Sequence, residues 1–127
     1  MRGVLDTSVF IADEQGRQLA IEQLPDEAAI SVVTLAELEL GVHVAASEEV
    51  RAHRLRTFRA THSAYVALPV DDAVASAFAE LVATARRAGR RPKVQDTWIA
   101  ATAHAHSVAV FTQDSDFDDL RVEVVRV

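Results

Sequence analysis

Short apolar runs alternate with segments of helical periodicity along the whole chain. The apolar runs contain little polar alternation, which is typical of strands that are buried on both faces of a sheet. We expect strands at residues 2–5, 28–33, 65–69, 108–112 and 122–127. We expect helices at residues 7–14, 17–24, 34–46, 48–63, 71–88 and 96–106. Strands that alternate with helices in this way predict a mostly parallel sheet with helices on both of its faces.

The helix signal is strongest in residues 71–88. Apolar side chains recur there at spacings of three and four residues, at Val74, Phe78, Leu81 and Ala85. This spacing places the side chains on one face of a helix, which can pack against a core. An aspartate pair at its start and Gly89 at its end are typical helix boundaries.

The composition is that of one folded domain. The chain has 127 residues, of which 50% are hydrophobic and 25% are charged, so we expect a single domain over residues 1–127. No apolar run is long enough to span a membrane, and Asp6 interrupts the apolar stretch at the N-terminus, which therefore lacks a signal-peptide pattern. There is no cysteine, which excludes disulfides and thiolate metal sites. We therefore expect a cytoplasmic protein with no membrane association.

Basic residues are concentrated in two short segments, although the formal net charge is −6. Nine of the 13 basic residues lie in these segments: Arg51, Arg54, Arg56 and Arg59 in the first, and Arg86, Arg87, Arg90, Arg91 and Lys93 in the second. Such local patches can bind a phosphate backbone even on an acidic protein. Taken alone, the clusters favour solvated helix faces.

Five acidic residues fall where the predicted strands end or the following helices begin. They are Asp6, Glu37, Asp96, Asp114 and Asp116. The carboxyl ends of parallel strands share one edge of a sheet, which is where such folds place their working residues. We therefore expect these side chains to converge at that edge, although they are far apart in sequence.

Each acid also has an explanation as a helix cap. Asp6 can cap the helix that begins at Thr7, and Asp96 can cap the alanine-rich helix. Thr34 and Glu37 fit a capping box, in which the glutamate bonds back to the helix start. Asp114 and Asp116 can cap the turn that follows them. Caps do not explain why four separate elements all place acids at one edge.

Crowded carboxylates repel one another, and a divalent cation removes that repulsion. Ligands that are all oxygen atoms favour Mg²⁺ or Mn²⁺. The histidines show no metal-binding spacing, so we do not expect them in the ligand set. The chemistry that uses such a site is phosphodiester hydrolysis. If Arg90, Arg91 and Lys93 border the acids, they can hold the phosphates of RNA.

Four stretches in order resemble the PIN-domain ribonucleases, in particular the VapC-type toxins of bacterial toxin–antitoxin pairs. They are Val4-Leu5-Asp6-Thr7-Ser8, Ser31 to Leu38 with Gly41, Lys93 to Ala103, and Thr112-Gln113-Asp114-Ser115-Asp116-Phe117. Each motif is weak alone, but four in the correct order are specific. The resemblance covers residues 4 to about 120 and implies a three-layer α/β/α sandwich.

The resemblance also implies residue roles. Asp6, Asp96, Asp114 and Asp116 resemble the ligands of Mg²⁺ or Mn²⁺, and Glu37 resembles the acid that orients the attacking water or a second ion. Thr7, Ser8 and Thr112 resemble the hydroxyls that support these acids, although Thr7 and Ser8 can equally bond the helix start. Trp98 and Phe117 flank the acids, where core packing is favoured over stacking on RNA bases. Asp118 and Asp119 are interpreted as a solvated helix face.

The implied function is a metal-dependent endoribonuclease toxin. It would cleave structured RNA such as tRNA or rRNA, inhibit translation, form a homodimer and bind a small cognate antitoxin that blocks the site. An RNA-processing nuclease of the same type without an antitoxin is one alternative. A Mg²⁺-binding, receiver-like signalling domain is another, but it needs a lysine after a late strand, and the only lysine is Lys93, before a helix. A catalytically silent interaction module is disfavoured because the set of acids is complete.

Overall fold

A computed structural model describes residues 1–127, and its centre is a five-stranded, entirely parallel sheet. The strand order is β3-β2-β1-β4-β5. The strands are β1 (Arg2–Leu5), β2 (Glu27–Ser31), β3 (Ala67–Leu68), β4 (Ala109–Thr112) and β5 (Val124–Arg126). The first strand of the chain is therefore the central strand, and Val4 pairs with Ala29 on one side and Val110 on the other. The predicted parallel sheet is confirmed.

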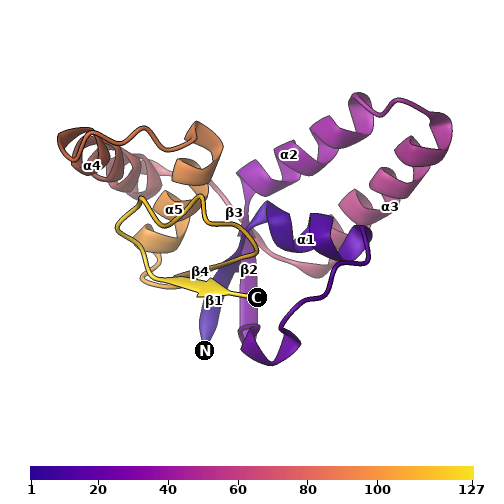
Figure 1. Ribbon diagram of the computed structural model, residues 1–127, viewed down its shortest axis with the longest axis horizontal. Coiled ribbons are helices and arrows are strands. Elements are labelled where there is room, and N and C mark those ends of the chain that lie inside the picture. The colour runs from indigo at the N-terminus through magenta and orange to yellow at the C-terminus, as the bar shows by residue number, and fades with distance from the viewer.

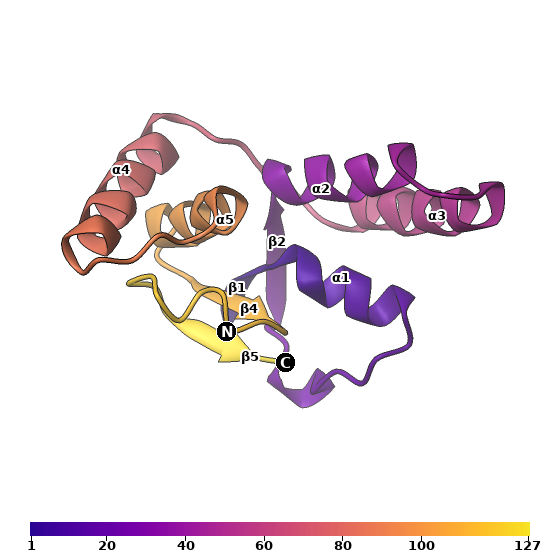
Figure 2. The ribbon, with the colours of Figure 1, turned by 45° about the horizontal axis from the view of Figure 1, so that its top comes forward.

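Five α-helices cover the sheet. They are α1 (Thr7–Glu14), α2 (Val32–His43), α3 (Glu48–Ala64), α4 (Asp72–Arg87) and α5 (Val94–Ala105). Figures 1 and 2 show α4 and α5 on one side of the sheet, and α1 with the α2–α3 pair on the other. This arrangement confirms the predicted three-layer α/β/α sandwich.

Alternation along the buried strands divides the core between the two faces of the sheet. Val4 and Val110 pack with α4 and α5, whereas Leu5 and Phe111 pack with α1 and Ile30. A Cβ atom built at Gly3 would lie 2.1 Å from Phe111 Cε1. The glycine therefore leaves the space that the Phe111 ring fills.

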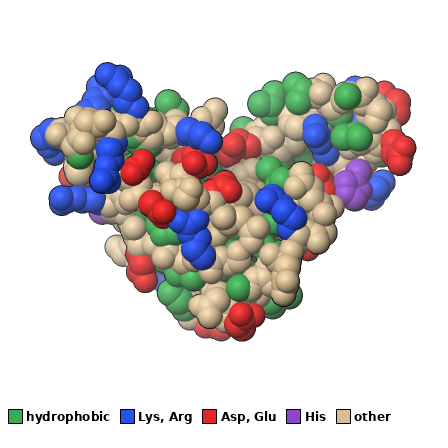
Figure 3. All heavy atoms as spheres, viewed as in Figure 1, with side chains coloured by type: hydrophobic (Ala, Val, Ile, Leu, Met, Phe, Trp, Pro, Cys, Tyr) green, Lys and Arg blue, Asp and Glu red, His purple; other side chains and the backbone are tan.

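The helix pairs form two lobes above the carboxyl ends of the strands. The α4–α5 pair makes one lobe and the α2–α3 pair makes the other, as the ribbon shows (Figure 1). The space-filling view shows a notch between the lobes, with acidic side chains at its base (Figure 3). The topology thus brings the strand ends to the floor of an open cleft.

The predicted helix at 17–24 is wrong. Only a short 3₁₀ helix forms there, at Ile21–Gln23. Gly16, with φ +69°, follows the last turn of α1. Because β1 and β2 are parallel, the chain must then return from the carboxyl end of β1 to the amino-terminal end of the sheet to begin β2. An α-helix rises only about 1.5 Å per residue, so an extended segment covers this distance with fewer residues.

The second helix begins earlier than predicted. It starts at Val32 instead of residue 34, and its cap is Ser31, whose Oγ accepts a hydrogen bond from Val33 N (3.1 Å). The capping box of Thr34 with Glu37 is therefore wrong, and both side chains are free for other contacts. None of the helices combines the length and apolarity needed to cross a bilayer.

Candidate active site

Asp6 is buried at the end of the central strand, with 2% of its surface exposed. Its Oδ2 accepts hydrogen bonds from Ser8 N (3.3 Å) and from Thr112 Oγ1 (2.9 Å). The first bond makes Asp6 the N-cap of α1, as predicted. The second joins β1 to the end of β4, so capping is only part of its role.

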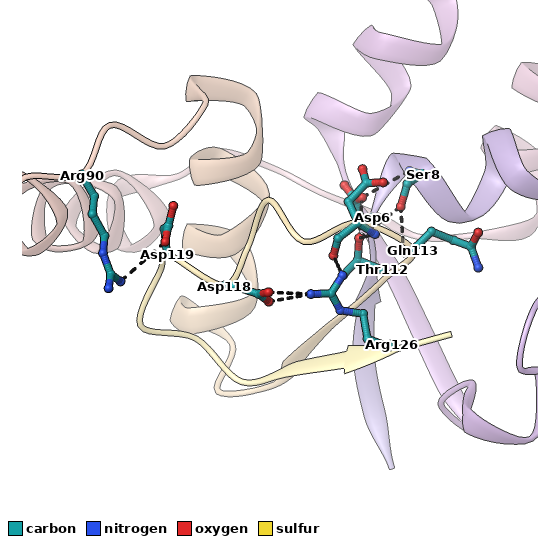
Figure 4. A network of polar contacts seen from close by, with 9 residues as sticks. Asp6, Ser8, Arg90, Thr112, Gln113, Asp118, Asp119 and Arg126 are labelled. Atoms are coloured by element: carbon teal, nitrogen blue, oxygen red, sulfur yellow. Dashed lines mark hydrogen bonds and ion pairs between the residues drawn. The ribbon is translucent and has the colours of Figure 1, made fainter.

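Hydroxyl groups connect the two strand ends (Figure 4). Ser8 Oγ and Thr112 Oγ1 are 3.1 Å apart. Thr112 donates its one proton to Asp6, so Ser8 donates to Thr112. The backbone N–H of Gln113 bonds Ser8 Oγ (3.0 Å), and that of Asp114 bonds Thr112 Oγ1 (3.0 Å). These contacts fix the loop that carries Asp114 relative to Asp6.

Glu37 lies on α2 and points to the start of α1. Thr7 Oγ1 donates to Glu37 Oε1 at 2.7 Å and lies 3.0 Å from Thr34 Oγ1. Thr7 Oγ1 is the donor in both contacts, and because a hydroxyl has a single proton, Glu37 and Thr34 share it, with the shorter contact to the carboxylate. Thr34 is completely buried. A chain of two threonine hydroxyls therefore leads to the Glu37 carboxylate.

Asp96 is the least compensated acid of the molecule. It lies in the first turn of α5, but it is not the N-cap of that helix; the N-cap is Lys93, whose side chain makes no capping bond. The Oδ2 atom of Asp96 is buried and has no hydrogen-bond partner. Burial, followed by the negative charges of Asp6, Asp116 and Glu37, raises the pKa of Asp96 to about 7.

The pKa values of two further acids are also raised. For Asp6 the cause is burial, with a small contribution from the charge of Asp114, and the bonds from Ser8 and Thr112 oppose it. For Glu37 the cause is burial and then the charge of Asp6, while the bond from Thr7 lowers the pKa. These mutual effects show that the acids of four elements lie within electrostatic reach of one another.

Lys93 is the cation at this edge. Its Nζ is 3.1 Å from Asp116 Oδ2, and this contact, with the charges of Asp96 and Asp114, raises the pKa of Lys93. Arg90 instead points to Asp119, at 3.7 Å. The predicted basic segment thus borders the acids through Lys93, and the prediction that Arg90, Arg91 and Lys93 bind RNA stays a prediction.

The fit of a cation to this edge rests on Asp96. No group of three or more Asp, Glu or His side chains is already arranged closely enough to hold a metal ion. However, a buried carboxylate oxygen without a partner is costly, and the charges of Asp6, Asp116 and Glu37 act on the same group. A divalent cation would remove both the missing contact and the repulsion, so the donor set suits Mg²⁺ or Mn²⁺. The assignment of Asp6, Asp96, Asp114 and Asp116 as ligands stays a prediction.

The last acidic loop is held from the C-terminal strand. Arg126 forms two bonds with the Asp118 carboxylate, at 2.7 and 2.8 Å, and also donates to the carbonyl of Asp114 (Figure 4). Asp118 and Asp119 lie in a turn and pair with arginines, so their interpretation as a helix face is wrong, although both are exposed. Arg126 was not a predicted site residue.

The aromatic residues near the acids serve packing. Phe117 is completely buried in the core, and Trp98 stacks on Phe78 with ring centroids 3.8 Å apart. The interpretation of both as core residues is confirmed. All five histidines are exposed.

Comparison with known protein families matches residues 3–123 to the PIN domain. The chain therefore belongs to the PIN-domain family. Its relatives in that family include VapC proteins, which confirms the VapC-type resemblance. It is 48% identical to ribonuclease VapC5 of Mycobacterium tuberculosis over 98% of this chain and 95% of the relative. It is 42% identical to ribonuclease VapC4 of the same organism, over 99% and 97% of the two chains.

Solved structures agree with this placement. The fold matches the crystal structure of VapBC-5 from Mycobacterium tuberculosis, a member of the VapBC family of toxin–antitoxin systems, with a TM-score of 0.92. The two chains are 45% identical, and the match covers 99% of this chain and 98% of the other. The family rules out the receiver-like alternative.

Proposed function

We propose that this protein is a VapC-type endoribonuclease toxin that uses Mg²⁺ or Mn²⁺ to cleave structured RNA, such as tRNA or rRNA, and thereby inhibits translation. The proposal is carried by Asp96, whose Oδ2 is buried without a partner and whose carboxylate lies within electrostatic reach of Asp6, Asp116 and Glu37. The ribonuclease names of its M. tuberculosis relatives support the same chemistry.

The side chains of this edge divide the work of phosphodiester hydrolysis. Asp6, Asp96, Asp114 and Asp116 would hold the cation, which when bound stabilises charge on the attacked phosphate and acidifies a water molecule. Glu37 is set to accept a proton from that water, because its raised pKa brings it closer to neutral pH and Thr7 fixes one of its oxygens. Lys93 Nζ supplies a positive charge beside Asp116 for the approaching phosphate backbone.

Partners follow from the same relatives. The similarity to a protein of the VapBC toxin–antitoxin family supports a small antitoxin that binds this chain and blocks the acidic edge. We also expect a homodimer, which light scattering of the purified protein would test. Co-expression of the antitoxin should restore growth, and growth inhibition that no neighbouring gene relieves would favour the RNA-processing alternative.

Cleavage of RNA by the purified protein tests the proposal. We expect cleavage of labelled tRNA and rRNA stem-loops with Mg²⁺ or Mn²⁺, and none with EDTA. Asp6→Asn and Asp96→Asn should each lower the rate by at least about a hundredfold with an unchanged circular dichroism spectrum, because they remove a ligand charge. Asp13→Asn removes an exposed acid of α1 and is the matched control, with an unchanged rate.

Two results would contradict the proposal. Activity that persists in EDTA would exclude a metal-dependent reaction. A wild-type rate in Asp96→Asn would remove the central role of that carboxylate. Sequencing of RNA 5′ ends after induced expression would identify the RNA and the position of the cut.

A further inference from the structure

A second recess lies beside the acidic edge, on the lobe made by α4 and α5. It is a cavity of about 230 Å³ between the last turns of α4, the loop that follows it and the first turn of α5. Lysine and arginine side chains gather over this lobe, next to the acidic base of the notch (Figure 3). The predicted phosphate-binding segment forms only part of its wall.

The wall of the cavity combines positive charge with an apolar surface. Arg86, Arg90 and Arg91 supply the charge, and Phe78, Val82 and Pro92 supply the apolar part. Phe78 is held by its stack with Trp98, so this surface is fixed. A ligand that complements both the arginines and the apolar part of the wall carries an anionic group and a flat apolar face.

The arginines of the cavity are largely free to bind such a ligand. Arg86 and Arg91 take part in no ion pair and no side-chain hydrogen bond of the structure. Arg90 has only the exposed 3.7 Å contact with Asp119, which contributes little. A nucleotide matches unpaired guanidinium groups at the rim of an apolar recess. The guanidinium groups can bind its phosphate and can also stack on its base.

The cavity lies on the same lobe as Asp96 and Lys93. Thr97 lines it and is the next residue after Asp96, and Pro92 lines it and is the residue before Lys93. A nucleotide bound there would therefore belong to the same strand as the scissile phosphate. A base that is stacked and paired within a helix cannot enter such a recess without being extruded.

We propose that this cavity binds one unpaired nucleotide of the RNA substrate next to the scissile bond. The proposal rests on the ribonuclease function proposed above and adds to it a binding site for one nucleotide outside the set of acids. Arg86 and Arg91 bind the phosphates of this nucleotide, and Val82 and Pro92 contact its base.

Binding measurements on the full-length Asp96→Asn protein separate this proposal from the cleavage reaction. The probes are a fluorescently labelled RNA hairpin with an open loop and an RNA duplex of the same length. We expect Arg86→Ala and Arg91→Ala to weaken binding of the hairpin about tenfold each and to change duplex binding less than twofold. Val82→Asp should weaken hairpin binding similarly, because a charge replaces the apolar surface.

Arg87→Ala is the matched control. Arg87 is the next residue of the same helix and is equally basic, but it does not line the cavity, so its loss should change hairpin binding less than twofold. Equal losses in Arg86→Ala and Arg87→Ala, or equal losses for hairpin and duplex, would reduce the effect to general charge and overturn the proposal. Unchanged RNA binding with weaker antitoxin binding would assign the cavity to a protein partner and also overturn it.

The two proposals fail in different ways. If the active protein cleaves RNA with metal but Arg86→Ala and Arg91→Ala bind the hairpin like the parent, only the nucleotide cavity is wrong. If the variants lose hairpin binding but no metal-dependent cleavage is found, the RNA site stands and the nuclease function fails.

Discussion

The Glu37 carboxylate is held by a threonine that comes from another helix and by a second threonine behind it. Thr34 contacts Thr7, and Thr7 bonds Glu37. Thr34 is completely buried and touches no acid directly, so it is a positioning residue. Its hydroxyl matters because its contact with Thr7 Oγ1 holds that hydroxyl beside Glu37 Oε1, which fixes the oxygen proposed to accept a proton from water.

Thr34→Val tests this chain of hydroxyls. Valine has nearly the same shape, so we expect a small change in the free energy of unfolding, about 1 kcal/mol. We expect kcat to fall roughly tenfold with KM unchanged, because only the orientation of Glu37 is lost. Thr34→Ser restores the hydroxyl and should restore most of kcat.

Thr57→Val is the control for this prediction. Thr57 Oγ1 also donates to a glutamate, Glu14 Oε1 at 2.7 Å, but this pair lies on α3 and α1 outside the set of acids. Its loss should leave kcat unchanged. A parallel fall of kcat in both variants, or no rescue by serine, would mean that Thr34 only stabilises the fold.

At the level of single residues, the sequence predicted which acids gather at the edge better than it predicted what holds them. Asp6 and Asp114 could be assigned because each follows a buried strand, and parallel strand ends share an edge. The role of Thr34 could not be assigned from the sequence. The direction of its side chain depends on α2 starting at Val32, two residues earlier than the helical pattern indicates. The sequence did contain a signal for the burial of Thr34. Thr34 and Leu38 are four residues apart and so share one face of the helix, and both are buried.

At the level of elements, the local sequence pattern did not determine the secondary structure of every segment, and the fold of the whole chain determined the rest. The segment 17–24 has residues that favour a helix, but between Gly16 and β2 the chain forms only the short 3₁₀ helix Ile21–Gln23. The strands at 2–5 and 108–112 were predicted from apolar runs that are largely buried, whereas β2 ends at Ser31, two residues before the predicted end, and β3 and β5 are only partly buried. What β5 does was not predictable, because an arginine near the end of a chain carries no pattern that links it to a loop.

Arg126 of β5 joins the last strand to the acidic loop. It binds Asp118 through two bonds and also binds the carbonyl of Asp114. An exposed ion pair adds little to global stability, about 1 kcal/mol at most, so the effect should be local. We therefore expect Arg126→Ala to loosen the loop without unfolding the protein.

Hydrogen exchange measures this effect. The amide of Asp118 bonds Ser115 O within the loop, and its exchange should become about tenfold faster in Arg126→Ala. Arg126→Lys keeps the charge but has one nitrogen in place of the two that bond Asp118 and the Asp114 carbonyl, so its exchange rate should lie between those of the wild type and Arg126→Ala. Arg121→Ala removes an exposed arginine of the preceding segment and should change nothing. Unaltered exchange in Arg126→Ala would show that the backbone alone fixes this loop.

At the level of the whole molecule, the acidic edge costs stability when it is ionised and empty of metal. The pKa values of Asp6, Glu37 and Asp96 are all raised in the folded protein. The folded state therefore binds more protons than the unfolded state between their ordinary values and the raised ones. Stability must fall as pH rises through that interval.

Unfolding by urea at different pH values tests this linkage. In EDTA, we expect the free energy of unfolding to fall between about pH 4, near the ordinary pKa of aspartate, and about pH 7, the pKa of folded Asp96. Solvent screening of this half-buried group limits its share to about 1–2 kcal/mol. Asp96→Asn should flatten the decline, whereas Asp13→Asn should not.

Added metal provides a second test of the link between ionisation of these acids and the free energy of unfolding. Mg²⁺ or Mn²⁺ should stabilise the wild type more at pH 8 than at pH 5, because ionised carboxylates bind the ion. Equal stabilisation at both pH values, or a stability that rises across this range in EDTA, would contradict the account.

The position of β1 at the centre of the sheet also has a consequence for synthesis of the protein. The first strand to be synthesised, β1, cannot pair with β4 until nearly the whole chain has been made. Asp6 likewise accepts its hydrogen bond from Thr112, which is 106 residues later in the chain. A growing polypeptide on the ribosome therefore holds an unfinished acidic edge until its final segment emerges. If the proposed site is correct, we expect no RNA cleavage by a chain that is still being translated, which would give an antitoxin time to bind.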